Sequence, residues 1–249
     1  YGGGYGSYLI PPQNIIFNHC NYKGNYCSDN GGAFGGVIYN IDTLLVLKSI
    51  QFNHCQFTLN SALGNGGALF IDMASDESPI ELNNCTFEVN KASGDCGAIF
   101  IDSKNDVVID SCNFVNNSAF KSLSSSYDPT DSLYIHGNGN VLINQTNFIK
   151  GSFVNEQANH QFSHINTLQN EKKDFNVSIN YCMFSIINPN MNQLFAQEIK
   201  NVGCFYISYS SFTHFITNTN INKDLLLLFE SENSIDFRLL GNDDYNHLF

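Results

Sequence analysis

The 249-residue chain has no tryptophan and only 11 lysine and arginine residues, among which Arg238 is the single arginine. Aspartate and glutamate number 23, so the formal net charge is −12. A nucleic-acid-binding protein needs clustered Lys and Arg to neutralise phosphates, and attachment to an anionic membrane surface needs the same charges. The composition therefore predicts no nucleic-acid partner and disfavours adhesion to anionic membranes.

Long apolar runs and closely spaced cysteine pairs are also missing. The longest apolar run, 225–229, is far shorter than the roughly 18 residues that cross a bilayer, so we expect no membrane span. None of the eight cysteines belongs to a C-x-x-C pair, which disfavours a structural zinc site. The chain starts at Tyr1 rather than Met, which indicates a mature product or a segment of a longer chain.

What the chain has instead is a repeated phrase. The segment 82–92 closely matches the segments 52–62 and 109–119. A fixed phrase separated by loops of variable length is typical of stacked structural units. The aromatic residue of the phrase recurs at spacings of 27 to 36 residues, as Tyr22, Phe57, Phe87, Phe114, Phe148, Phe184 and Phe212.

The spacing of apolar residues within the phrase indicates β-strands. Apolar residues stand five and seven positions before the aromatic, and a small residue stands two positions before it. This alternation of inward and outward residues shifts by one residue at an Asn, which stands four positions before the aromatic. Because Asn tolerates the left-handed backbone of a tight bend, we expect the bend at this Asn. A third apolar strand is expected after the phrase Gly66-Gly67-Ala68 and its echo Cys96-Gly97.

This pattern predicts an all-β fold, a right-handed parallel β-helix (a solenoid) of about 7–8 rungs with three short strands per rung. Adjacent rungs of such a coil lie about 4.8 Å apart, so like residues stack on like. A β-sandwich gives no reason for residue types to recur at fixed slots. A β-propeller has Gly and Trp cues, and the chain has no Trp.

Stacking predicts columns of like residues. About one residue in seven is Asn, and an asparagine ladder is expected along one corner, formed by Asn18, Asn53, Asn83, Asp110, Asn144 and Asn180. A second polar corner is expected at Asn25, Asn60, Asn90 and Asn117. An inward cysteine column is expected at Cys20, Cys55, Cys85, Cys112 and Cys182. Disulfides Cys20–Cys55 and Cys85–Cys112 are within reach, but parallel stacking strains their dihedral, so we favour packed thiols.

The phrases Phe-x-x-Asn and Gly-Gly-Ala-apolar resemble the repeat of the chlamydial polymorphic outer-membrane proteins. They stand at 57–60 with 66–69, at 87–90 with 97–99, and at 114–117. Related repeats occur in large surface proteins of some protists. The resemblance is specific for three rungs and extends diffusely over residues 14 to 215. It implies a pectate-lyase-like right-handed β-helix on an extracellular protein that is often adhesive.

Four N-glycosylation sequons begin at Asn84, Asn116, Asn144 and Asn176. Asn84 and Asn176 fall on outward slots, so we expect N-linked glycans there if the chain is secreted. Asn116 lies near the second corner, and Asn144 belongs to the ladder, where a sugar fits poorly. These sequons favour a secreted, extracellular or cell-surface protein of a eukaryote.

The sequence divides into three parts. Residues 1–13 are a Gly/Tyr-rich segment that we expect to be flexible, and 14–221 form the β-helix. Residues 222–249 are expected to cap the coil or to contact another subunit. Open ends of a parallel coil expose unpaired backbone, so self-association through the termini is predicted, with glycans as possible further partners.

Catalytic and metal-binding phrases are scarce. Asp72 and Asp102 share a slot after the third strand, and two carboxylates could hold Ca²⁺, although two solvated aspartates explain the pattern more simply. The paired acidic residues of a glycoside hydrolase and the basic residues of a polysaccharide lyase are not evident. We therefore expect no enzyme and no cofactor.

The sequence favours a structural glycoprotein, a β-helical subunit of a surface coat, fibre or appendage. One alternative is a surface adhesin that binds glycans or host or prey cells, which exposed aromatics on one face would support. The other alternative is a polysaccharide lyase or hydrolase, which a groove holding Asp72, Asp102 and calcium would support.

Overall fold

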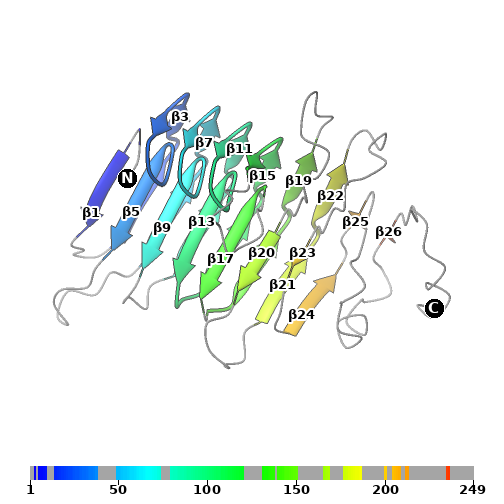
Figure 1. Cartoon of the computed structure of the whole chain (residues 1–249). Coiled ribbons are helices and arrows are strands. Elements are labelled where there is room, and N and C mark those ends of the chain that lie inside the picture. The colour runs from blue at the N-terminus through cyan, green and yellow to red at the C-terminus, as the bar shows by residue number, and fades with distance from the viewer. Residues whose placement is uncertain are drawn as a thin grey trace.

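The chain is a parallel β-solenoid in the computed structural model. The structure describes residues 3, 5–9, 14–38, 49–73, 79–120, 131–137, 139–150, 165–168, 176–186, 199–200, 204–208, 211–212 and 234–235. None of these residues is helical, and their strands pair in parallel with the next strand of the same sheet. Figure 1 shows the strands of successive turns side by side along the coil.

Four sheets run along the coil. The first contains β1 (Tyr5–Leu9), β5 (Phe34–Ile38), β9 (Leu69–Met73), β13 (Ile99–Ser103), β17 (Leu133–Gly137), β20 (Ile165–Leu168) and β23 (Ile199–Lys200). The second contains β2 (Asn14–Asn18), β6 (Ser49–Asn53), β10 (Ile80–Asn83), β14 (Val107–Asp110), β18 (Val141–Asn144), β21 (Asn176–Asn180) and β24 (Cys204–Ser208).

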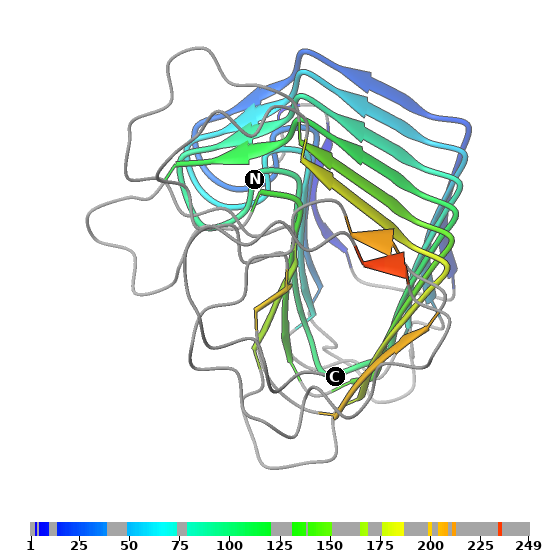
Figure 2. The ribbon, with the colours of Figure 1, turned by 90° about the vertical axis from the view of Figure 1, so that its right-hand side faces the viewer.

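The third sheet contains β3 (Asn21–Lys23), β7 (Gln56–Thr58), β11 (Thr86–Glu88), β15 (Asn113–Val115), β19 (Asn147–Lys150), β22 (Met183–Ile186), β25 (Ser211–Phe212) and β26 (Ser234–Ile235). The fourth contains β4 (Tyr26–Cys27), β8 (Ser61–Ala62), β12 (Lys91–Ala92) and β16 (Ser118–Ala119). In the view along the coil, equivalent strands lie one behind another (Figure 2).

Three turns are described without a break, at 14–38, 49–73 and 79–103. Each runs through all four sheets, so the prediction of a parallel β-solenoid is confirmed. The prediction of three strands per turn missed the two-residue strands β4, β8, β12 and β16, which were taken for a corner. They are shorter than the span over which an alternating pattern can be recognised.

The aromatic column fills the interior. Rings from Tyr22 to Phe184 stack face to face, with successive centroids 4.8 to 4.9 Å apart and interplanar angles of 11° or less. Phe57, Phe87 and Phe114 are fully buried. Each ring packs on the ring of the next turn, so the aromatic column forms a continuous part of the core.

The bend near the predicted asparagine ladder lies one residue later than expected. The left-handed residues are those that follow the ladder, with φ of 53° at His19, 54° at His54 and 53° at Asn84. A second left-handed position precedes the other polar corner, with φ of 58° at Leu59 and 54° at Val89. The ladder residue therefore ends each strand of the second sheet, and its neighbour turns the chain.

The predicted ladder makes hydrogen bonds between turns on the outside of the coil. The Asn53 amide donates to Asn18 Oδ1 at 2.9 Å, and the Asn83 amide donates to Asn53 Oδ1 at 3.0 Å. The Asn144 amide donates to Asp110 Oδ1. The expected asparagine side-chain hydrogen bonding is therefore present, although these side chains are only partly buried or exposed.

A second asparagine ladder lies inside the coil, and we call Asn25, Asn60, Asn90 and Asn117 the inner ladder. The Asn60 side chain donates to Asn90 Oδ1 at 2.9 Å, and the Asn90 side chain donates to Asn117 Oδ1 at 2.9 Å. The same amides donate to the backbone carbonyls of Tyr22 and Phe57 at 3.0 and 2.9 Å. Asn60 and Asn90 are fully buried, and these bonds satisfy their amide groups.

The terminal segments are described only in part. Within the predicted N-terminal segment 1–13, Tyr5–Leu9 forms β1 and pairs in parallel with β5. In 222–249, β26 pairs with β25. The remaining residues of the expected cap lie outside the described part of the chain.

Candidate functional site

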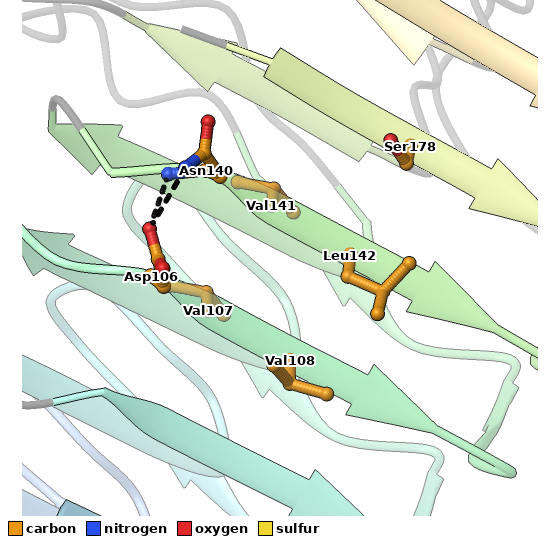
Figure 3. Close-up of a pocket in the computed structure, with 7 residues that line it drawn as sticks. All are labelled: Asp106, Val107, Val108, Asn140, Val141, Leu142 and Ser178. Carbon is orange, nitrogen blue, oxygen red and sulfur yellow. Dashed lines mark hydrogen bonds between the residues drawn. The ribbon is translucent and has the colours of Figure 1, made fainter.

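A shallow hollow lies on the outer face of the second sheet, across β14, β18 and β21. Its volume is about 420 Å³, and it is lined by Asp106, Val107, Val108, Asn140, Val141, Leu142 and Ser178. Val108, Leu142 and Ser178 pair in register on neighbouring strands. Figure 3 shows the Val108 and Leu142 side chains projecting from the sheet, with Ser178 on the next strand.

The hollow combines an apolar floor with fixed polar groups. Leu142 is 39% exposed. At one end, Asn140 donates to Asp106 Oδ1 through its backbone N–H at 2.9 Å and its side-chain amide at 3.2 Å. In the preceding turns Gln51 and Glu81 occupy the slot of Val108.

Sequence reasoning missed this hollow. The available signal was the change from Gln51 and Glu81 to Val108 and Leu142 at an outward slot of the second sheet.

The candidate calcium residues lie side by side on the first sheet. Asp72 of β9 pairs in register with Asp102 of β13, and Asp102 pairs with His136 of β17. His136 Nδ1 lies 3.1 Å from Asp102 Oδ2. Burial, and secondarily the charge of Asp102, raises the pKa of the Asp72 carboxyl. Within the described residues, no three His, Cys, Asp or Glu side chains gather into a metal-binding group.

The cysteine column lies at the corner between the second and third sheets, two residues before the aromatic column. The seven cysteines whose side chains are described are free thiols. The backbone N–H of Cys55 donates to Cys85 Sγ, and that of Cys85 donates to Cys112 Sγ, each at 3.4 Å. Burial raises the pKa of Cys182 to about 12. Raised pKa values keep thiols protonated at neutral pH, where they are poor nucleophiles.

Three of the four sequon asparagines have described side chains. Asn84 is exposed on a left-handed corner, with φ of 53°. Asn116 is partly buried, and its neighbour Asn117 belongs to the buried inner ladder. Asn144 donates its amide to Asp110 within the outer ladder. The side chain of Asn176 lies outside the described part, although its backbone begins β21.

Two exposed histidines stack on the corner that follows the outer ladder. The His19 and His54 rings lie 4.9 Å apart with an interplanar angle of 6°. Asn84 follows them in the same column, so the corner requires polarity rather than imidazole.

Among the described residues, none forms a helix long and apolar enough to cross a membrane. Comparisons with protein-family models, with curated proteins and with solved structures found no match to the chain. The resemblance to the polymorphic outer-membrane repeat therefore rests on the repeat phrases alone. What the structure adds is the coarser assignment, a parallel β-solenoid with asparagine ladders.

Proposed function

We propose that the chain is a non-enzymatic structural glycoprotein of the cell surface, a β-helical subunit of a coat, fibre or appendage. In this proposal the coil is a right-handed, pectate-lyase-like β-helix of about 7–8 turns, as the repeat phrases and the handedness of parallel crossovers favour. Its copies stack end to end through their first and last turns.

The observation that carries the proposal is the unbroken register of the second sheet. One slot runs through the strands from β2 to β24 as Ile15, Ile50, Ile80, Val107, Val141, Val177 and Phe205. The first and last described strands of this sheet therefore carry an apolar residue at the same position. A last turn placed against a first turn would continue the pattern without a change of register.

The first described turn has two strands at the edges of their sheets. Among the described strands, β2 and β3 lie at the edges of the second and third sheets. Ile15 is only partly buried, whereas Ile50 in the same slot of the next turn is fully buried. Strand edges with unpaired backbone groups are sites of addition for another chain. A second copy of this chain is the partner whose strand residues best match those of the first described turn.

The backbone of β2 offers a direct test. His19 donates its N–H to Asn53 in the next turn. Because donor direction alternates along a parallel strand, the N–H of Ile16 faces the opposite way, toward the edge. Ile16→Pro removes this donor and keeps the bonds to β6. We expect the variant to stay folded but to lose concentration-dependent association in sedimentation velocity.

Ile16→Thr is the matched control, because it shortens the same half-exposed side chain and keeps the N–H. It should associate as the wild-type chain does. Association of Ile16→Pro at the wild-type level would remove β2 from the interface and oppose end-to-end stacking.

A surface adhesin is the second candidate, and the hollow at Val108 and Leu142 favours it. Leu142→Lys places a charge on the apolar floor, whereas Glu81→Lys changes charge on the same face outside the hollow. An adhesin that uses the hollow should lose glycan or cell binding with the first variant only. Its association state should not change with either.

A further inference from the structure

An exposed corner of the coil holds two histidines that the corner itself does not require. In successive turns the position after the outer asparagine ladder has a left-handed backbone and is occupied by His19, His54, Asn84, Ser111, Gln145 and Tyr181. Side chains of several kinds therefore satisfy this corner. Asn84 and Gln145, from turns farther along the coil, are exposed there as well, so exposure belongs to the corner and not to one end of the chain.

The backbone holds the two imidazoles side by side. Asn18 and Asn53 pair in register, and the backbone N–H of His19 donates to the Asn53 carbonyl at 2.9 Å. The backbone N–H of His54 donates to the Asn83 carbonyl at 2.9 Å. The φ angles of the two histidines are 53° and 54°, so their side chains leave the chain in the same direction. The rings consequently stack with their centroids 4.9 Å apart and an interplanar angle of 6°.

This spacing is close to what one metal ion requires of two imidazole ligands. Imidazole nitrogen is a good ligand for Zn²⁺, Cu²⁺ and Ni²⁺. A tetrahedral Zn²⁺ with bonds of about 2.1 Å holds two ligand nitrogens about 3.4 Å apart, so the stacked rings must approach each other by about 1.5 Å. Both side chains are exposed, and no described residue holds either ring by a hydrogen bond. Rotation about the side-chain bonds can therefore close the gap while the backbone stays in place.

We propose that His19 and His54 together bind one borderline divalent metal ion, of the class of Zn²⁺, Ni²⁺ and Cu²⁺, through one nitrogen of each ring. Water completes the coordination shell, because the described residues supply no third His, Cys, Asp or Glu to the group. Such a site keeps open positions and holds its ion less tightly than a structural site with four protein ligands. The net charge of −12 favours cations near the surface.

His136 offers a matched comparison, because its imidazole is already engaged. Its Nδ1 lies 3.1 Å from Asp102 Oδ2 on the first sheet, and Asp72 lies on the next strand beyond Asp102. Carboxylate oxygens suit Ca²⁺ and Mg²⁺ better than the proposed ions. Loss of the His136 imidazole should therefore leave the site at His19 and His54 intact.

The test titrates the full, reduced and unglycosylated chain with Zn²⁺, using calorimetry for affinity and NMR of the imidazole resonances for location. The ring resonances of His19 and His54 should shift together as one ion binds. His54→Asn introduces the residue that the next turn carries in this slot, and it should weaken this site at least about tenfold because one of two linked ligands is lost. His136→Asn should bind at this site as the wild-type chain does. Circular dichroism checks that each variant is folded.

A rescue experiment makes the test specific to the column. His19→Asn should weaken binding as His54→Asn does, and the double variant should bind no more weakly than either single variant, because both residues serve one site. Adding Asn84→His to the His19→Asn variant rebuilds an imidazole pair with His54 one turn farther along the coil. Binding should then return to within about threefold of the wild-type affinity.

Three outcomes would overturn the inference. One is Zn²⁺ binding that neither His19→Asn nor His54→Asn weakens. Another is a shift of one ring resonance without the other. The third is failure of Asn84→His to restore binding in the His19→Asn chain. The inference does not depend on the proposed assembly: Zn²⁺ binding by a chain that stays monomeric would leave the site intact and count against the proposed function alone.

Discussion

Asn90 donates its side-chain N–H to Asn117 Oδ1 at 2.9 Å, in the fully buried interior of the solenoid. The Asn90 backbone N–H donates to the same oxygen at 3.0 Å, and the Asn90 amide also donates to the Phe57 carbonyl at 2.9 Å. Asn90 Oδ1 in turn accepts two hydrogen bonds from Asn60. One side chain thus joins three consecutive turns.

Removal of this side chain should be costly. Asn90→Ala leaves the Phe57 carbonyl, the Asn60 N–H groups and one Asn117 lone pair without their partner in a buried site. Each unsatisfied buried group costs about 1–3 kcal/mol, so we expect a loss of about 3 kcal/mol or more in unfolding free energy. Urea unfolding measures it. The matched control is Asn83→Ala in the outer ladder, which should cost about 1 kcal/mol or less because water replaces the lost bond. Equal losses would contradict the distinction between the ladders.

Val89 is held in a backbone conformation that suits it poorly. Its φ is 54°, whereas glycine and asparagine occupy the same slot at Gly24 and Asn116. A left-handed backbone costs a side chain with a Cβ about 1–2 kcal/mol, and a β-branched residue tolerates it least. Val89→Asn should therefore raise the unfolding free energy by about 1 kcal/mol.

The control for this prediction is Val115→Asn, at an ordinary strand position of β15. It should give no gain, because asparagine is disfavoured in strands. A loss of stability in Val89→Asn would show that the Val89 side chain contributes more by packing than the backbone strain costs.

The cysteine column should weaken the fold at high pH. The hydrogen bond with the Cys112 side chain, and secondarily burial, raises the pKa of the Cys85 thiol from 9.0 to about 12. Below pH 9.0 the thiol is protonated in both states, so its contribution is complete. Above that pH the unfolded chain loses a proton that the folded chain keeps, so stability falls by about 1.4 kcal/mol per pH unit for each such thiol.

Urea unfolding of the reduced chain at about pH 8 and pH 10 measures this slope. Cys85→Ala should have a lower stability at the first pH but a shallower fall between the two. Phe57→Leu lowers stability without removing a thiol, so its slope should match that of the wild-type chain. An unchanged slope in Cys85→Ala would mean that Cys85 titrates alike in both states.

Glycosylation should follow the exposure of the sequons. Expressed through a eukaryotic secretory pathway, the chain should carry a glycan at Asn84, which projects from an exposed corner. Asn144 should remain unmodified, because its amide is engaged by Asp110 in the ladder. Peptide mapping with enzymatic removal of the glycan distinguishes the sites, with Asn84→Gln as the control. A glycan on Asn144 of the folded protein would contradict the ladder.

The parallel solenoid could be predicted because each inward slot recurs with one residue type. The alignment of Phe57, Phe87 and Phe114 in the sequence corresponds to their register in the third sheet. The third strand, predicted to follow Gly67 and Gly97, is found as β9 and β13, which pair in register. Strand pairing in such a coil follows from sequence spacing, because like residues occupy adjacent turns.

The corners were harder to predict. Asn was expected at the left-handed position because of its intrinsic preference, yet His54, Ser111 and Tyr181 occupy it. The hydrogen-bonded turns on either side impose the conformation and outweigh the local preference. The burial of Asn60 and Asn90 could not be inferred from polarity, because their satisfaction depends on partners about one turn away.

Imaging of the native protein by electron microscopy, without heating or reduction, tests the central claim most directly. Copies that stack end to end should form fibres whose axial repeat is about 35 to 40 Å per copy, the length of 7–8 turns at the strand spacing. Ile16→Thr should form the same fibres, and Ile16→Pro should give short particles. Discrete monomers of the wild-type chain at every concentration would contradict the account.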